Sequence, residues 1–141
     1  MKLDLSSLRK AVESLERTIC LTNDNHFMAG LSDDAKDAIR SGVIQNFEVA
    51  YEFCWKYVQR WLKENVPVEQ AENPRSRKEL FRVAARLGLI NDPESWFSYG
   101  DARNLTTHTY NENTAESVYN TALVFVKDAR RLLQKLEESN E

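Results

Sequence analysis

Apolar residues recur at spacings of three and four along most of the chain, which is the period of amphipathic α-helices. The first such stripe lies within residues 3–22 and predicts one helix there. Asn23-Asp24-Asn25 ends this helix, and we expect a polar loop to follow. The stripe consists of Leu5, Leu8, Val12, Leu15 and Ile19.

The next helix is long and is predicted over roughly residues 33–64. Ser32 supplies a cap, and Asp33 and Asp34 place acidic groups in the first turn. Its apolar positions form a broad band, which indicates a central helix with neighbours on more than one side. The band includes Ile39, Val43, Ile44, Phe47, Tyr51, Cys54, Trp55, Val58 and Leu62.

Residues 65–74 are predicted to form a loop, after which the cap signals return. Ser76 and Glu79 have the spacing of a capping box, for a helix that continues to Leu87 and stops at Gly88. These signals predict a third helix of about three turns.

Two more helices complete the pattern. Asp92 and Pro93 are start signals for a short helix that carries Trp96, Phe97 and Tyr99 toward residue 101. Asn113-x-x-Glu116 predicts the start of a last long helix. The fold class is therefore all-α, an up-and-down four-helix bundle plus a short extra helix. The inner side of the last helix carries Val118, Ala122, Phe125, Ala129, Leu132, Leu133 and Leu136.

Composition supports the all-α class and indicates where in the cell the protein is expected. The chain has 141 residues, which suggests a single domain over 1–141, and its 4 Gly and 3 Pro argue against an all-β protein. A net charge of -3 excludes a general polyanion binder and leaves nucleic-acid contact to a local patch. No apolar segment predicts a leader or a membrane span, so we expect a cytoplasmic protein. Cys20 and Cys54 fall in apolar helical patterns, which predicts buried free thiols.

Residues 101–110, DARNLTTHTY, concentrate groups that carry chemistry. On a helix, Asp101, Asn104 and His108 would share one face, whereas Arg103 and His108 lie about 140° apart. Histidine can take a proton from a ribose 2′-hydroxyl, and arginine can hold a phosphate. Asn104 can orient the imidazole, and Tyr110 offers a hydroxyl for modification. The spacing alone favours a polar cluster that only caps a helix end and ties it to a neighbour.

A second candidate is a row of cations on the third helix. Positive charge also crowds the N-terminal end of this helix, at Arg75, Arg77 and Lys78. Cations there oppose the helix dipole, so RNA phosphate or an acidic partner surface would be favourable at this end. A solvated helix face is the alternative. Glu48 and Glu52 are interpreted as surface carboxylates or as partners of Lys56, and no metal site is predicted. The row consists of Arg75, Lys78, Arg82 and Arg86.

Three segments together resemble one known family. They are SGVIQNFEVAYEFCWKYVQRWL (41–62), PRSRKELFRVAARLGLINDPESWF (74–97) and DARNLTTHTY. They resemble, in the same order, the nucleotidyltransferase substrate-binding protein family. This family is a branch of the HEPN superfamily that includes the HepT toxins.

The resemblance implies a homodimer and a metal-independent endoribonuclease without a cofactor. Arg103, Asn104 and His108 match the catalytic motif, at a cleft between two subunits. The implied partner is a small separate nucleotidyltransferase of the MntA type, encoded nearby, which transfers AMP to the position of Tyr110 and silences the toxin. The alternative is a non-catalytic substrate- or nucleotide-binding subunit of a two-component nucleotidyltransferase. The chain has no phosphate-binding loop of its own, so it is not itself expected to be a nucleotidyltransferase.

Overall fold

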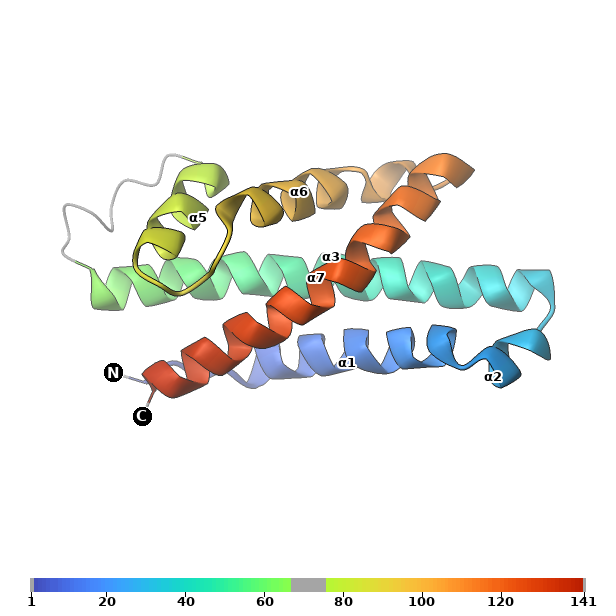
Figure 1. Cartoon of the computed structure of the whole chain (residues 1–141), viewed down its shortest axis with the longest axis horizontal. Helices are drawn as coiled ribbons and strands as arrows, with labels where there is room; N and C mark the ends of the chain where they lie inside the picture. The colour runs from blue at the N-terminus through green and yellow to red at the C-terminus, as the bar shows by residue number, and fades with distance from the viewer. Residues whose placement is uncertain (1, 67–75, 141) are drawn as a thin grey trace.

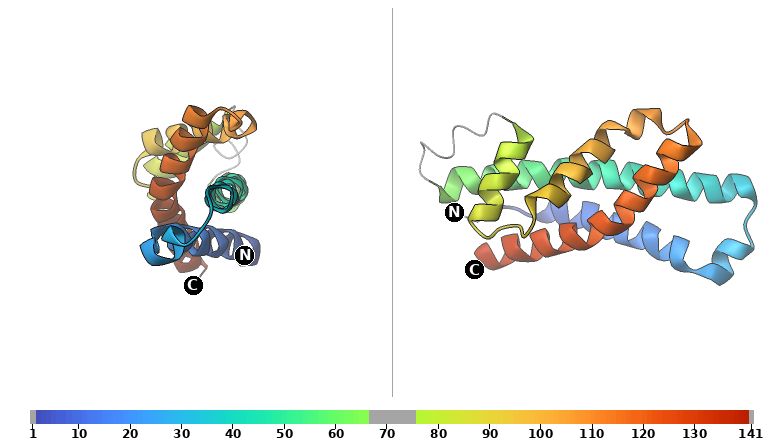
Figure 2. Two further views of the ribbon diagram at one scale, coloured as in Figure 1. Left: turned by 90° about the vertical axis from the view of Figure 1, so that its right-hand side faces the viewer. Right: turned by 45° about the horizontal axis from the view of Figure 1, so that its top comes forward.

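One long helix runs through the middle of the molecule and the others pack around it (Figure 1). The computed structural model describes residues 2–66 and 76–140. The central helix is α3 (Asp33–Asn65), with α1 (Ser6–Asn23) along one side of it. α7 (Glu112–Ser139) crosses α3 and also packs against α1, as the two views of Figure 2 show.

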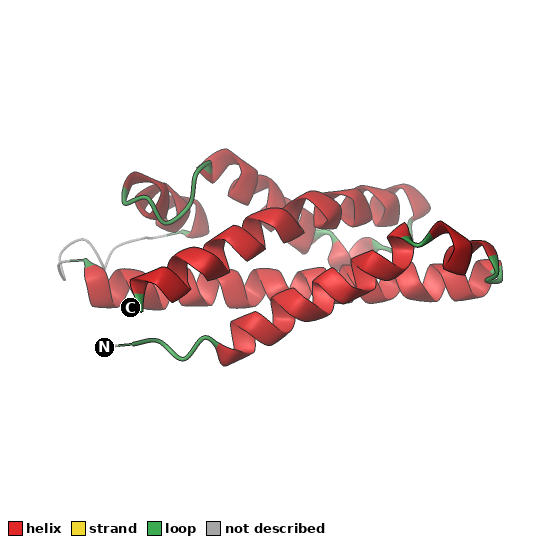
Figure 3. Ribbon diagram, turned by 60° about the horizontal axis from the view of Figure 1, so that its bottom comes forward, coloured by secondary structure: helices red, strands yellow, loops and turns green. Residues whose placement is uncertain are grey.

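The shorter helices cover the side of α3 that faces away from α1. They are α5 (Arg77–Arg86) and α6 (Pro93–Asn104), which pack against each other and against α3 (Figure 1). The described residues contain no strand, as Figure 3 shows. The predicted helical bundle is therefore confirmed. None of the described helices is long and apolar enough to cross a membrane.

A short helix, α2 (Asn25–Ala29), occupies the segment that the sequence pattern assigned to a polar loop. The Asp24 side chain accepts a hydrogen bond from the backbone N–H of Phe27 at 3.0 Å and caps this helix. Its side chains are polar or partly exposed, so the sequence has no apolar periodicity that would predict this helix. Asp24 thus ends one helix and begins the next.

Most predicted helix starts are confirmed by their caps. The hydroxyl oxygen of Ser32 accepts from Ala35 N–H at 3.1 Å, and that of Ser76 accepts from Glu79 N–H at 3.2 Å. The predicted start of α7 at Asn113 is wrong by two residues. Asn111 is the cap, because its side-chain oxygen accepts from the backbone N–H of Asn113 itself at 3.0 Å.

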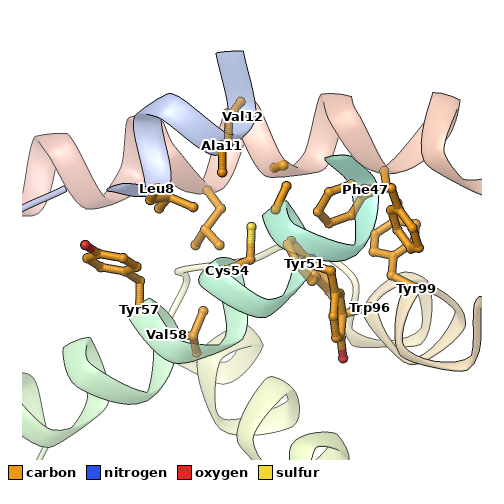
Figure 4. Packing of buried hydrophobic residues seen from close by; sticks show 14 of the residues in the cluster. Leu8, Ala11, Val12, Phe47, Tyr51, Cys54, Tyr57, Val58, Trp96 and Tyr99 are labelled. Atoms are coloured by element: carbon orange, nitrogen blue, oxygen red, sulfur yellow. The ribbon is translucent and has the colours of Figure 1, made fainter. Parts of the chain in front are cut away.

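Aromatic side chains from four helices meet at the centre of the core, and Figure 4 shows those of α3 and α6, among them Phe47, Tyr51, Trp96 and Tyr99. Phe125 of α7 lies edge-on to Phe47 and Tyr99, each at 5.1 Å between ring centroids, and Trp96 stacks on Phe81 at 5.1 Å. Such pairs add about 0.5–1.5 kcal/mol each beyond the apolar area they bury. They fix α5 and α6 against α3 and α7.

The two cysteines differ in their surroundings. Cys54 lies fully buried in the core beside Tyr51 (Figure 4), and burial raises the pKa of its thiol. Cys20 is exposed, so the prediction of a buried thiol there is wrong. It follows Ile19, and one residue turns a helix by about 100°, which takes Cys20 off the buried stripe. Both cysteines are free.

Candidate functional site

The C-terminal end of α6 and the turn after it position the DARNLTTHTY segment. α6 ends at Asn104, and residues Thr106–His108 form a single 3₁₀ turn, η1. The backbone N–H of His108 donates to the carbonyl of Leu105 at 2.9 Å, an i→i+3 bond. The prediction that Asp101, Asn104 and His108 share one helical face is therefore wrong for His108.

Arg103 is held by two carboxylates of α3. Its Nε donates to Glu52 Oε1 at 2.8 Å, and its Nη1 lies 3.7 Å from Glu48 Oε2. Thr106 donates its hydroxyl to the same Glu48 oxygen at 2.7 Å and links η1 to α3. Arg103 makes no other side-chain hydrogen bond within the described chain, and 30% of its side chain is exposed. Its remaining N–H groups are thus available to an external anion.

Glu52 joins three helices through its two oxygens. Besides Arg103 it pairs with Arg77 of α5, at 3.2 Å between Nη1 and Oε1, and accepts from the Trp55 indole N–H at 2.8 Å. Burial acts to raise the pKa of Glu52, but the Trp55 hydrogen bond and the two arginines outweigh it and lower that pKa. The expected pairing with Lys56 is wrong, because partners from α5 and α6 take its place. No cluster able to hold a metal ion occurs among the described residues.

His108 and Tyr110 are accessible side chains at the end of the segment. Their ring centroids lie 6.2 Å apart in an edge-on arrangement, and Tyr110 is 86% exposed. Neither side chain hydrogen bonds to another group in the part of the chain that the structure describes. The structure shows no hydrogen bond from His108 to Arg103 or Asn104, so the predicted orienting contact from Asn104 is absent from the single chain.

A pocket of about 350 Å³ opens between α3, α5 and α6, next to Arg103 and Asn104. Its walls include Tyr51 of α3, and His108 does not line it. Arg77 reaches into this pocket, with its guanidinium carbon 4.4 Å from the centre of the Trp55 ring. The pocket, which Arg103 and Asn104 line, and the His108–Tyr110 turn are thus two separate features.

The predicted row of cations on α5 is only partly described. Lys78 and Arg82 both lie over the ring of Phe97, at 5.6 and 5.1 Å, and Arg86 is exposed at the helix end. Arg75 lies outside the described residues. The row therefore rests partly on an aromatic side chain of α6. It is not an entirely solvated face.

Residues 3–138 match the family described as "Nucleotidyltransferase substrate binding protein like". The chain belongs to this family. A Haemophilus influenzae protein named "Probable ribonuclease HepT" is 33% identical over 140 residues, which span 99% of this chain and 96% of that protein. The family resemblance drawn from the three sequence segments is thereby confirmed.

Two solved structures have the same fold as this family member. A Haemophilus influenzae structure, described as revealing the fold of a substrate binding domain of a nucleotidyltransferase, superposes with a TM-score of 0.90 at 32% identity. It covers 95% of this chain and 99% of its own. A crystal structure from Thermus thermophilus superposes with a TM-score of 0.71 at 28% identity, covering 92% and 98%.

The sequence did not predict that two residues, Glu52 and Arg77, would lie beside Arg103 in the candidate site. Glu52 and Arg77 lie 25 positions apart in the sequence, and each is 26 or more from Arg103, so no local spacing connects them. The cation crowding at the start of α5 was the one available signal for Arg77. The carboxylate partner of Arg103 can be identified only once α6 is packed on α3 in the structure.

Proposed function

We propose that this protein is a HepT-like, metal-independent endoribonuclease that acts as a homodimer. The observation that supports the proposal is that an anchored arginine, Arg103, and an exposed histidine, His108, lie close together in the sequence. Arg103 is held by Glu52 with N–H groups left for an anion, and His108 is exposed one turn later. Two copies of this surface, facing each other, bring an arginine and a histidine from different chains to one phosphate.

The chemistry follows from these two side chains. A neutral His108 accepts the proton of a ribose 2′-hydroxyl, whose oxygen attacks the adjacent phosphorus. The bond from phosphorus to the 5′-oxygen breaks, and that oxygen takes the proton back from the His108 imidazolium to leave as a hydroxyl. The products are a 2′,3′-cyclic phosphate and a 5′-hydroxyl end. Arg103 stabilises the charge on the phosphate oxygens, and Asn104 is positioned at the same surface.

A nucleotidyltransferase encoded nearby is the proposed partner, and Tyr110 is the proposed acceptor of AMP. The Tyr110 oxygen attacks the α-phosphorus of ATP, its phenol proton leaves, and pyrophosphate departs. The 86% exposure of Tyr110 supports access by a second protein. AMP placed beside His108, whose ring is 6.2 Å away, blocks the approach of RNA. Such a block is the proposed means by which the antitoxin silences the toxin.

The ribonuclease proposal is tested by incubating the purified protein with single-stranded RNA in excess chelator. We expect cleavage by the wild type and none by His108→Ala. The chain has one other histidine, the exposed His26 of α2, and His26→Ala is the matched control that retains activity. Cleavage that survives His108→Ala at the wild-type rate rejects the assignment.

The AMP proposal is tested by co-expression with the neighbouring transferase and intact-mass measurement. We expect one added adenylate per chain in the wild type and none in Tyr110→Phe. The Tyr110→Phe protein should then stay toxic in the presence of the transferase. An adenylate on Tyr110→Phe would place the modification elsewhere.

A second candidate is a non-catalytic substrate-binding subunit of a two-component nucleotidyltransferase. It is favoured by the family description and by the pocket beside Arg103. It predicts a stable complex with the transferase, together with no RNA cleavage and no growth arrest when the protein is expressed alone. Growth arrest that depends on His108 excludes it.

A further inference from the structure

Residues 105–110, which carry His108, lie at the surface without an apolar anchor. None of these six side chains is buried, and the segment contains only the single 3₁₀ turn η1. A turn of this length has few backbone hydrogen bonds of its own, and segments with few buried apolar contacts open easily. The position of His108 relative to the helices therefore depends on polar contacts of this turn.

Thr106 supplies the one side-chain hydrogen bond from η1 to α3 or α7 among the described residues. Its hydroxyl donates to Glu48 Oε2 of α3 at 2.7 Å. The same hydroxyl lies 2.8 Å from the backbone carbonyl oxygen of Arg103, which is a common local acceptor for threonine. A hydroxyl has only one proton to donate, and a carboxylate oxygen is the stronger acceptor. The bond to Glu48 therefore dominates.

Glu48 faces Arg103 with the same oxygen. Its Oε2 lies 3.7 Å from Arg103 Nη1, so one atom contacts both the arginine and the turn that carries His108. Glu48 lies within α3, a helix of 33 residues, and its side chain is two-thirds shielded from water. Partial burial strengthens a hydrogen bond relative to one in bulk water. A single carboxylate on a long helix thus sets where the Arg103 side chain and η1 lie relative to each other.

We propose that Thr106 is a positioning residue, which holds the turn that carries His108 against α3 through Glu48. Its role in RNA cleavage rests on the proposed ribonuclease function. In the proposed dimer each chain gives an arginine to one site and a histidine to the other. The Thr106–Glu48 contact keeps Arg103 and His108 of one chain in a fixed relation, so that both sites have the same geometry. Neither Thr106 nor Glu48 needs to touch the RNA.

The first test measures RNA cleavage by Thr106→Val, which keeps the shape of the side chain and removes its hydroxyl. We expect kcat to fall about 10- to 100-fold with KM nearly unchanged, because a displaced His108 slows the chemical step while Arg103 still binds phosphate. Thr106→Ser keeps the hydroxyl and should recover most of the rate. The matched control is Thr121→Val, whose lost hydroxyl donates to the Ser117 carbonyl within α7 at 3.0 Å, and its kcat should equal that of the wild type.

A double variant separates the bond to Glu48 from the local bond to the Arg103 carbonyl. In a Glu48→Ala background, Thr106→Val should cause no further loss of kcat, because the hydroxyl has already lost the acceptor through which it acts. Equal fold-losses with and without Glu48 would place the effect in the local bond and overturn the proposal. Thr106 lies in a surface turn, so its variants are expected to fold, and circular dichroism checks this.

A measurement that does not depend on catalysis keeps the two proposals apart. The chain has two histidines, so NMR resolves one imidazole signal from each. Thr106→Val should shift or broaden the signal of His108, whose ring lies 6.2 Å from that of Tyr110, and leave the His26 signal unchanged. If that response occurs and Thr106→Ser reverses it while the wild type never cleaves RNA, the positioning contact stands and the ribonuclease proposal fails. A wild-type kcat in Thr106→Val, or an unchanged His108 signal, overturns the positioning role.

Discussion

Several arginine–glutamate pairs join helices among the described residues, and two of them, Arg130–Glu16 and Arg103–Glu52, differ in how completely the arginine is used. Arg130 of α7 grips Glu16 of α1 with two hydrogen bonds, one of them from Nε at 2.9 Å and the other from Nη2. Arg103 of α6 gives Glu52 a single hydrogen bond, from Nε at 2.8 Å. The two arginines have similar exposure, 33% and 30% of the side chain.

The difference lies in which groups surround each carboxylate. Glu16 offers both oxygens to Arg130, and its hydrogen bond raises the pKa of that guanidinium. Glu52 divides its oxygens among Arg103, Arg77 and the Trp55 indole. In the first pair both carboxylate oxygens accept from one arginine; we call it the saturated pair and expect it to contribute to stability. A carboxylate shared in the second way orients Arg103 and leaves its outer N–H groups for a ligand.

The largest expected effect is on RNA cleavage. Arg103→Ala should lower the cleavage rate about 100- to 1,000-fold, the usual loss when one stabiliser of transition-state charge is removed. Arg130→Ala removes the same side-chain type from the saturated pair and should cleave at the wild-type rate. Rates are measured on one RNA under single-turnover conditions, at equal dimer concentration.

Arg103→Lys refines that comparison, because it keeps the charge and loses the planar guanidinium fork. We expect it to remain well below the wild type in cleavage, since an ammonium cannot hold Glu52 and a phosphate in the same geometry. Equal losses of cleavage rate in Arg103→Ala and Arg130→Ala would show that the two arginines do not differ in their role.

Next in size is the effect on stability of a side chain at Gly100, where α6 packs closely against Tyr51 of α3. Gly100→Ala places a Cβ 2.8 Å from the Tyr51 hydroxyl oxygen and should destabilise the protein by about 1–3 kcal/mol. The Gly100→Ala/Tyr51→Phe double variant removes the crowded oxygen and should recover most of that loss. Urea unfolding followed by circular dichroism measures both.

Gly42→Ala in α3 is the matched control, because a Cβ there meets nothing within 4 Å. It should stabilise the protein by up to about 1 kcal/mol through helix propensity alone. A stabilising Gly100→Ala would mean that Tyr51 moves without cost and that the contact between α6 and α3 at position 100 is not tightly packed.

The contrast between the two pairs also shows how far sequence patterns reach. The helices and most caps follow from local signals, such as Ser32 and Ser76, because caps and apolar stripes act within a turn or two. The break after Asn104 escaped prediction, since its neighbours are compatible with continued helix. The sharing of Glu52 also escaped, because it depends on how α5 and α6 pack on α3. The motif residues Arg103 and His108 were found through the family resemblance, since their spacing alone was ambiguous.

Acid should weaken the interactions of the Glu52 carboxylate with Arg103 and Arg77 and so lower the stability of the protein. The folded-state pKa of Glu52 lies below its ordinary value of 4.5, so the folded protein binds fewer protons there than the unfolded chain. This contribution to stability is complete above about pH 4.5 and is lost as the pH falls through the lowered pKa. Glu52→Gln should therefore show a shallower loss of unfolding free energy between about pH 6 and pH 3. Parallel pH curves for the two proteins would contradict the assignment of this pKa.

The smallest expected effect is the coupling within the saturated pair. Arg130 and Glu16 are both about one-third exposed, so water screens their attraction and the pair should contribute about 0.2–1 kcal/mol. A double-mutant cycle with Arg130→Ala and Glu16→Ala isolates that term from the packing of the arginine stem. The bidentate geometry favours the upper end of the range. A coupling near zero would leave α1 and α7 joined by apolar contacts and by the looser Arg9–Glu137 pair, whose Nη2 and Oε2 atoms are 3.7 Å apart. The number of hydrogen bonds that an arginine forms would then not predict its importance, because Arg103 forms fewer than Arg130 and is expected to matter more for cleavage.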